Sequence, residues 1–156
     1  MKALLLIVII GHHAASSSIA ADESKEDKVD QLLREGATAI HYIWTEWMGK
    51  PSLKYTKITE ENLKSLYGNW SGSYSKDDEE IAFIVSLSPR GKWTCEAFRP
   101  DMKNGHWYLS DGMLLLFESK IYDDANLASA LTLNDGKLRL LNADTEAGFV
   151  ELTKAE

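Results

Sequence analysis

The sequence predicts a mainly β protein: an eight-stranded antiparallel up-and-down barrel preceded by an N-terminal amphipathic α-helix. One observation is a Gly-x-Trp motif that occurs three times, at Gly68-Asn69-Trp70, Gly91-Lys92-Trp93 and Gly105-His106-Trp107. Glycine permits a turn or bulge, and the tryptophan two residues later places a large apolar side chain on one face of a strand. The other is a series of short apolar stretches, separated by turn residues, from residue 68 to the C-terminus. A meander of this length is best stabilised by closing on itself, because closure removes the exposed sheet edges.

The first twenty residues have the features of an export signal. Lys2 precedes the apolar run Leu4 to Ile10, and Ser18-Ile19-Ala20 fits a cleavage site of small residues. The apolar run is too short to cross a bilayer as a helix. We therefore expect an exported protein, periplasmic or secreted, whose mature chain begins at Ala21 or Asp22 and has no integral membrane segment. An uncut N-terminal anchor is the alternative.

Composition limits the classes of partner and the means of stabilisation. A chain of 156 residues with 44% hydrophobic and 26% charged residues fits one globular domain plus an appendage. Its formal net charge of −7 becomes −8 without residues 1–20, because Lys2 is the only charged residue among them. This charge argues against nucleic acid and anionic lipid as partners. Cys95 is the only cysteine, so no intrachain disulfide is possible, and we expect a small buried hydrophobic side chain there rather than a reactive thiol.

A long amphipathic helix is predicted from about Lys25 to Met48. Ser24 precedes it as an N-cap, and Gly49 supplies a left-handed stop. Apolar or small residues recur along it at steps of three and four: Val29, Leu33, Gly36, Ile40, Ile43 and Trp47. We expect this face to dock on the barrel, for example across one mouth. A lid or a partner-binding face is the alternative.

A connector over residues 51–57 leads to a second, short helix. Thr59 is placed as its N-cap and Leu66 as its end, with Ile58 and Leu63 spaced as a hydrophobic staple. The chain therefore divides into an export signal at residues 1–20, a helix and connector at 21–57, and a barrel at 58–156.

Eight strands are expected from the alternation of apolar and polar residues. Their apolar positions are Leu66 to Tyr74, Ile81 to Leu87, Trp93 to Ala97, Trp107 and Leu109, Met113 to Phe117, Leu127 to Leu133, Leu138 and Leu140, and Phe149 to Lys154. Turns are predicted between them: an acidic loop at Ser75–Glu79, a type I turn at Ser88–Gly91, a loop at Pro100–Gly105, a tight turn at Ser110–Gly112 and a hairpin at Asn134–Gly136. Met113 to Phe117 is continuously apolar, which predicts a strand covered on both faces, with the N-terminal helix outside it.

From Ile58 to Lys154 the chain resembles the lipocalin-like, calycin-type barrels, especially small exported bacterial ones. The resemblance is carried by the short helix followed by Gly68-Asn69-Trp70 and by a basic residue on the last strand, Lys154. It implies a structural motif in which Lys154 lies over Trp70 at the closed end of the barrel, next to Gly68. The chain departs from typical lipocalins because it lacks disulfides, has short loops and carries its helix before the barrel.

No catalytic constellation is present, so we expect a protein that is not an enzyme and has no cofactor. His41 and His106 are the only histidines after the export signal, and neither has zinc-ligand spacing with Cys95 or an acid. No Gly-x-Ser-x-Gly motif occurs. The acidic run Asp77 to Glu80 lacks the spacing of a calcium loop and is expected to be a solvated hairpin tip.

The aromatic residues of the strands are the candidate binding residues. Tyr74, Phe83, Trp93 and Trp107 lie on the apolar rows of four strands, so they either fill the barrel or line a pocket for a small apolar or aromatic ligand. Glu96 and Arg139 are candidate orienting groups, although strand alternation places Arg139 toward water. The alternative function is an envelope interaction or inhibitor protein with a filled barrel, which binds a protein partner through its N-terminal helix or its loops.

Overall fold

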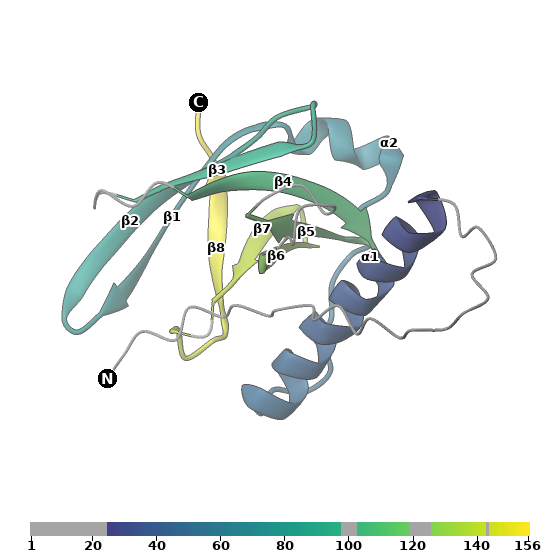
Figure 1. The fold of residues 1–156 in the computed structure, drawn as a ribbon. Coiled ribbons are helices and arrows are strands. Elements are labelled where there is room, and N and C mark those ends of the chain that lie inside the picture. The colour runs from purple at the N-terminus through teal and green to yellow at the C-terminus, as the bar shows by residue number, and fades with distance from the viewer. Residues whose placement is uncertain (1–24, 98–102, 119–125, 143) are drawn as a thin grey trace.

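The computed structural model of the chain describes residues 25–97, 103–118, 126–142 and 144–156. The expected export signal, the Ser24 cap and Pro100 lie outside these ranges. Within them, eight antiparallel strands close into a barrel in sequence order (Figure 1). The strands are β1 Gly68–Lys76, β2 Glu79–Leu87, β3 Lys92–Ala97, β4 Lys103–Ser110, β5 Met113–Phe117, β6 Leu127–Asn134, β7 Lys137–Leu141 and β8 Phe149–Lys154. The predicted fold class is confirmed.

Closure depends on a short pairing between the first and last strands. Trp70 and Ser71 of β1 pair with Lys154 and Thr153 of β8, whereas β1 pairs with β2 over the whole length of both strands. The barrel therefore has a long, continuous β1–β2 wall and a narrow seam at β1–β8.

Three hairpin turns have two consecutive residues with positive φ. They are Asp77 and Asp78, Asp111 and Gly112, and Asp135 and Gly136. Two positive-φ residues define the type I′ geometry that suits the twist of a hairpin, and aspartate tolerates that region better than most residues. The acidic loop expected at Ser75–Glu79 is therefore shorter than predicted, because β1 continues to Lys76 and β2 begins at Glu79.

Strand β4 begins earlier than the sequence predicts. The loop was expected to continue to Gly105, but Lys103 to Gly105 are paired with β3, and Gly105 lies opposite Trp93. Gly105 is a strand residue at a point of close approach: a Cβ atom there would lie 1.8 Å from the carbonyl oxygen of Phe117. Position 105 requires glycine because the backbone of β5 leaves no room for a Cβ atom, and not because the chain turns there.

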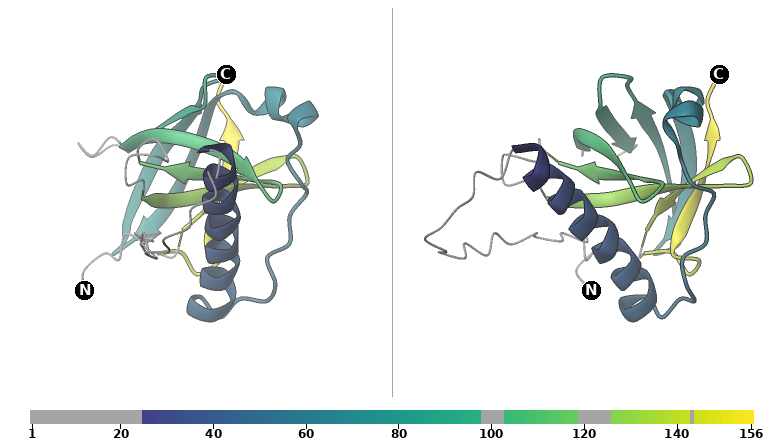
Figure 2. Two further views of the ribbon diagram at one scale, coloured as in Figure 1. Left: turned by 45° about the vertical axis from the view of Figure 1, so that its right-hand side comes forward. Right: turned by 90° about the vertical axis from the view of Figure 1, so that its right-hand side faces the viewer.

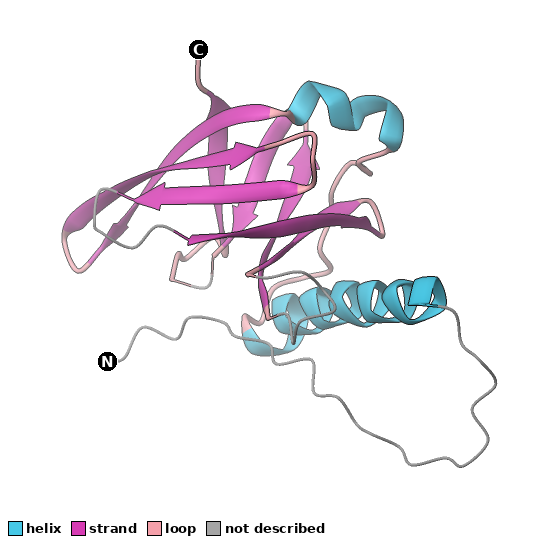
Figure 3. Cartoon of the chain, turned by 45° about the horizontal axis from the view of Figure 1, so that its top comes forward, coloured by secondary structure: helices cyan, strands magenta, loops and turns pink. Residues whose placement is uncertain are grey.

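Helix α1, Lys25–Tyr42, lies along the outside of the barrel wall formed by β4, β5 and β6 (Figures 2 and 3). The small residues Gly36 and Ala37 are buried there, and a Cβ at Gly36 would lie 3.0 Å from Leu115. The helix docks on the barrel as expected, but on its side and not across a mouth. In the described part of the chain, no helix combines the length and apolar character needed to span a membrane.

Strand β5 is buried on both faces, as its composition predicts. Leu114 and Leu116 belong to the cluster inside the barrel, whereas Met113, Leu115 and Phe117 belong to the cluster beneath α1. All five side chains are at most 1% exposed. Burying a side chain of this size contributes about 1.5–3 kcal/mol, so β5 joins the barrel and the helix into one folding unit.

The C-terminal end of the first helix departs from the predicted pattern. Residues Ile43–Trp47 form one turn of π-helix, η1, in which the Met48 amide donates to the Ile43 carbonyl. The wider turn rotates the following residues relative to the apolar face of the helix, so Trp44 is buried whereas Trp47 is 64% exposed. The expectation that Trp47 belongs to the buried face is therefore wrong. Gly49 ends the segment with φ +61°, as expected.

A short helical segment closes one end of the barrel. It consists of α2, Glu60–Leu63, and the 3₁₀ turn η2, Lys64–Leu66, with Thr59 as the N-cap in a capping box with Asn62. Ile58, Leu63 and Leu66 are buried in the interior cluster. We call this the plugged end of the barrel, and we call the end with the Asp77–Asp78 turn the hairpin end.

Candidate ligand-binding site

At the plugged end, Trp70 is fixed from two sides. Its indole N–H donates to the carbonyl oxygen of Leu66 at 2.8 Å, and its side chain is 6% exposed. The Lys154 ammonium lies 5.6 Å from the indole centroid and donates to the Ser65 carbonyl at 2.7 Å. A cation over an indole is attracted by the negative face of the ring. Gly68 begins β1 with φ +114°. A Cβ atom built on Gly68 would lie 3.7 Å from Cε of Lys154.

The other two tryptophans of the Gly-x-Trp motifs also bond to the backbone. The Trp93 indole N–H donates to the Phe117 carbonyl at 2.9 Å, crossing β4 at Gly105, which lies opposite Trp93. The Trp107 indole N–H donates to the Ser88 carbonyl at 3.0 Å, and its ring lies 6.1 Å from that of Tyr67. Both indole N–H groups are therefore used by the chain itself and are not available to a ligand.

Phe83 and Tyr74 lie farther along the interior, toward the hairpin end. Their rings contact edge to face, with centroids 6.1 Å apart and an interplanar angle of 65°. Phe83 is 5% exposed and belongs to the interior cluster, whereas Tyr74 is half-buried and packs against it. The four aromatic residues chosen from the sequence thus face one interior, but only Tyr74 and Trp107 keep part of their surface exposed.

The middle of the barrel is closely packed. A Cβ built on Gly72 would lie 2.7 Å from Leu152, 3.1 Å from Val150 and 3.2 Å from Phe83. The glycine therefore leaves room for side chains of β2 and β8 to meet in front of β1. At this level the barrel is filled by its own residues.

The hairpin end combines half-buried apolar side chains with ion pairs at the rim. Cys95 is half-buried and packs against the interior cluster, and burial raises the pKa of its thiol, opposed by the charge of Lys103. Lys103 lies 4.0 Å from Glu118, and Lys76 lies 2.9 Å from Asp144. Cys95 is therefore held as a neutral thiol in apolar surroundings.

The structure does not bring the candidate orienting groups into the interior. Glu96 is exposed on the outer surface of β3. Arg139 also points outward from β7, as strand alternation predicts, but it is not simply solvated. Its guanidinium carbon lies 4.2 Å from the centroid of the Phe149 ring, and its side chain is only 24% exposed.

A groove on the outside of the barrel surrounds this arginine, and sequence reasoning missed it. It has a volume of about 260 Å³ between the connector after η1 and the outer face of β6, β7 and β8. Its lining residues are Trp44, Pro51, Ser52, Leu53, Lys54, Thr132, Arg139, Leu141 and Phe149. Strand alternation identifies the outward residues, but only the path of the connector determines which of them become enclosed.

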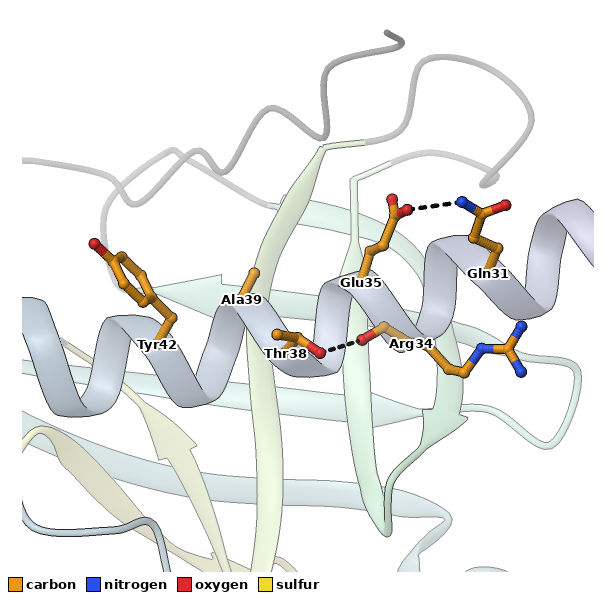
Figure 4. A pocket seen from close by; sticks show the side chains of 6 residues that line it. All are labelled: Gln31, Arg34, Glu35, Thr38, Ala39 and Tyr42. Carbon is orange, nitrogen blue, oxygen red and sulfur yellow. Dashed lines mark hydrogen bonds between the residues drawn. The ribbon is translucent and has the colours of Figure 1, made fainter. Parts of the chain in front are cut away.

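A second hollow lies on the solvent side of α1, around Arg34, Thr38 and Tyr42 (Figure 4). Its polar groups largely satisfy one another along the helix. Gln31 donates to Glu35 at 3.0 Å, and the Thr38 hydroxyl donates to the Arg34 carbonyl at 2.9 Å. The hollow is shallow and has no wall from another described element.

His41 belongs to a small polar cluster that ties α1 to the β4–β5 turn. Its Nε2 lies 3.0 Å from Asp111 Oδ2, and the Tyr55 hydroxyl donates to the Asp111 carbonyl at 2.8 Å. Lys57 completes the cluster 3.9 Å from Asp111. Burial and the hydrogen bond to Asp111 raise the pKa of Tyr55 to about 12, whereas the His41 contact in particular lowers the pKa of Asp111. Among the described residues, no three histidine, cysteine or acidic side chains converge as metal ligands.

Neither a known family model nor a curated protein sequence matches the chain. One solved structure, described as a "putative lipoprotein" from Shewanella oneidensis, is similar to it with 14% identity. The match covers 65% of this chain and 100% of the other, with a TM-score of 0.42. Identity at this level places no residue of this chain in a functional role.

Proposed function

We propose that the protein is an exported, non-enzymatic carrier or sensor of a small apolar or aromatic molecule, bound inside the hairpin half of the barrel. The observation that supports this most directly is the difference in burial along the interior. Trp70 and Trp93 are only 6% and 3% exposed, and their indole N–H groups donate to backbone carbonyls, whereas Tyr74 and Cys95 remain half-buried.

The apolar character of the interior cluster supports binding of an apolar ligand. The partly buried side chains packed against this cluster include Tyr67, Tyr74 and Cys95. An apolar ligand would contact Phe83 and Cys95, and Tyr74 would offer a ring face or a hydroxyl.

Binding is tested with the neutral fluorescent probe N-phenyl-1-naphthylamine, whose emission rises in apolar sites. The wild-type chain should enhance it saturably, and bound probe should slow iodoacetamide labelling of Cys95. In the wild type, fatty acids should compete with the probe. Cys95→Trp fills the proposed site and should abolish the enhancement of probe emission, and with it this competition.

Ile84→Trp is the matched control, because Ile84 lies on the outer face of the neighbouring strand and is 40% exposed. It should bind the probe like the wild type. Unchanged labelling of Cys95 at saturating probe would exclude this location, without depending on whether the Cys95→Trp variant folds. Intact-mass analysis of the protein exported from cells should show the loss of residues 1–20.

A protein-binding role is the second candidate, supported by two exposed aromatic residues. Tyr42 is 57% and Trp47 64% exposed at the C-terminal end of the first helical segment, although the other face of α1 is buried on the barrel. Native mass spectrometry of protein purified without detergent separates the two. A bound small mass that leaves on denaturation supports the carrier, whereas a clean mass even after incubation with fatty acids and aromatic metabolites favours the protein-binding role.

A further inference from the structure

The groove on the outside of β6, β7 and β8 has two aromatic walls held in fixed positions. Trp44 and Phe149 stack with centroids 6.4 Å apart and an interplanar angle of 24°. The Trp44 indole N–H donates to the Pro51 carbonyl at 2.6 Å, which fixes the ring against the connector. Gly148 backs the same ring, since a Cβ there would lie 2.8 Å from it. The walls are therefore preorganised, which lowers the entropic cost of binding a flat ligand.

Arg139 supplies a cation at this apolar surface. Its guanidinium lies over the Phe149 ring, and Nη2 donates to Glu151 at 3.2 Å. With the Asn134 amide oriented so that its oxygen faces the arginine, that oxygen accepts from Nη1 at 2.8 Å and Nη2 at 3.0 Å. The buried Nε has no hydrogen-bond acceptor. A buried donor without an acceptor costs free energy, so a shift of the guanidinium that opens Nε to a ligand oxygen would recover that free energy.

The other charges around the groove favour an anion of one charge. Lys54 lines the groove and is exposed. Glu151 is the acid nearest to Arg139, but it also accepts from Lys137 at 2.9 Å and is 41% exposed. Glu151 can therefore keep its Lys137 partner when an incoming carboxylate takes the Nε and Nη2 edge of Arg139, the side-on arrangement that suits bidentate pairing.

We propose that this groove is a second binding site, for a small aromatic carboxylate with a single ring. The ring packs against Phe149, Trp44 and Leu53, and the carboxylate accepts from Arg139, with Lys54 adding long-range attraction. The volume of about 260 Å³ is at the lower limit of ligand pockets and accommodates one ring with a short acid side chain. The site is separate from the barrel interior and does not depend on the function proposed for it.

The test is a titration of the ¹⁵N-labelled protein with phenylacetate, compared with the neutral isostere phenylacetamide. The five tryptophans of the chain give five indole N–H signals, and a Trp44→Phe variant identifies that of Trp44. Phenylacetate should shift the Trp44 signal saturably and leave those of Trp93 and Trp107 in place. Phenylacetamide should bind at least about tenfold more weakly, since a charge-assisted hydrogen bond is lost.

Variants locate the carboxylate. Arg139→Gln should weaken phenylacetate binding about tenfold to a hundredfold, whereas Lys137→Gln should weaken it by a smaller factor, because Lys137 does not line the groove and acts only by holding Glu151. Leu53→Trp fills the groove from the connector, keeps Arg139 and should abolish binding. Equal affinity for the acid and the amide, or binding unaffected by Leu53→Trp, would overturn the proposal. Shifts at Trp93 or Trp107 instead of Trp44 would also overturn it and assign the ligand to the barrel interior.

Discussion

The two ends of the barrel use aromatic residues in different ways. At the plugged end, the indole N–H groups of Trp70 and Trp107 each donate to a backbone carbonyl, of Leu66 and Ser88. At the hairpin end, Tyr74 and Phe83 contact each other edge to face, and the rim carries the Lys76–Asp144 and Lys103–Glu118 ion pairs. An indole bonded to the backbone of another segment fixes both segments, whereas contacts between side chains can adapt. The plugged end should therefore carry the stability of the fold, and the hairpin end should tolerate change.

The largest effect is expected from Gly105→Ala. The new Cβ would lie 1.8 Å from the Phe117 oxygen and 2.8 Å from backbone atoms of Glu118, and backbone cannot move as a side chain does. It would also displace the carbonyl that accepts from Trp93. We expect a loss of about 5 kcal/mol or more in urea unfolding, above the usual range of overpacking effects because the clash is with backbone atoms.

Gly136→Ala is the control for that substitution. Gly136 has φ +77° but no neighbouring atom within 4 Å, so only its backbone conformation opposes a side chain. It should cost about 1 kcal/mol. Similar losses in the two variants would show that β4 and β5 are not in close approach at Gly105.

Trp70→Ala should produce the next largest effect, about 3–5 kcal/mol, because it empties the space beneath α2. Trp70→Phe should lose about half as much, since it keeps most of the volume but leaves the Leu66 carbonyl without its donor. Urea unfolding followed by circular dichroism measures both. Near-unchanged stability of the alanine variant would contradict the assignment of the plugged end as the stabilising one.

The sequence predicted the strands well and the surfaces between elements poorly. The bounds of β5 and β8 were predicted to the residue, because an apolar run and clear turn signals define them. Because glycine is common in turns, the sequence favours a turn at Gly105. A glycine opposite Trp93 within a strand, however, also lets the indole side chain pass over that strand.

The outer groove shows why part of the surface could not be predicted. Alternation correctly placed Arg139 on the outer face, but Phe149 and Trp44 enclose it through tertiary packing. The π-helical turn at Ile43–Trp47 decides which tryptophan faces the barrel. If the α-helical period of 3.6 residues is continued through this segment, it places Trp47 as well as Trp44 on the apolar face. The pattern of apolar residues gives no sign of the wider turn.

A smaller effect is expected at the hairpin end from Tyr74→Ala. Tyr74 is half-buried and loses one edge contact with Phe83, so the cost should be about 1–2 kcal/mol, less than that of Trp70→Ala. The same denaturant series measures it. A loss as large as that of Trp70→Ala would remove the difference between the two ends.

The smallest effect concerns the polar cluster that holds α1 to the β4–β5 turn, and it depends on pH. The hydrogen bond with His41, then that with Tyr55, lowers the pKa of Asp111 below its value in the unfolded chain. A lowered pKa contributes stability that is present above about pH 4 and is lost as pH falls through the folded-state value. Because Asp111 is 45% and His41 37% exposed, solvent screening keeps the contribution below about 1 kcal/mol.

Asp111→Asn should therefore lower stability at pH 6 and lose less stability than the wild type between pH 5 and pH 3. Asparagine tolerates the φ of +50° at this position, so the turn itself should persist. Asp135→Asn is the matched control, because Asp135 has φ +48° at the equivalent position of the β6–β7 turn. Urea unfolding at each pH measures both variants. If the two show the same pH dependence, the cluster of His41, Tyr55 and Asp111 does not stabilise the docked helix, and its attachment depends on the apolar residues of β5 alone.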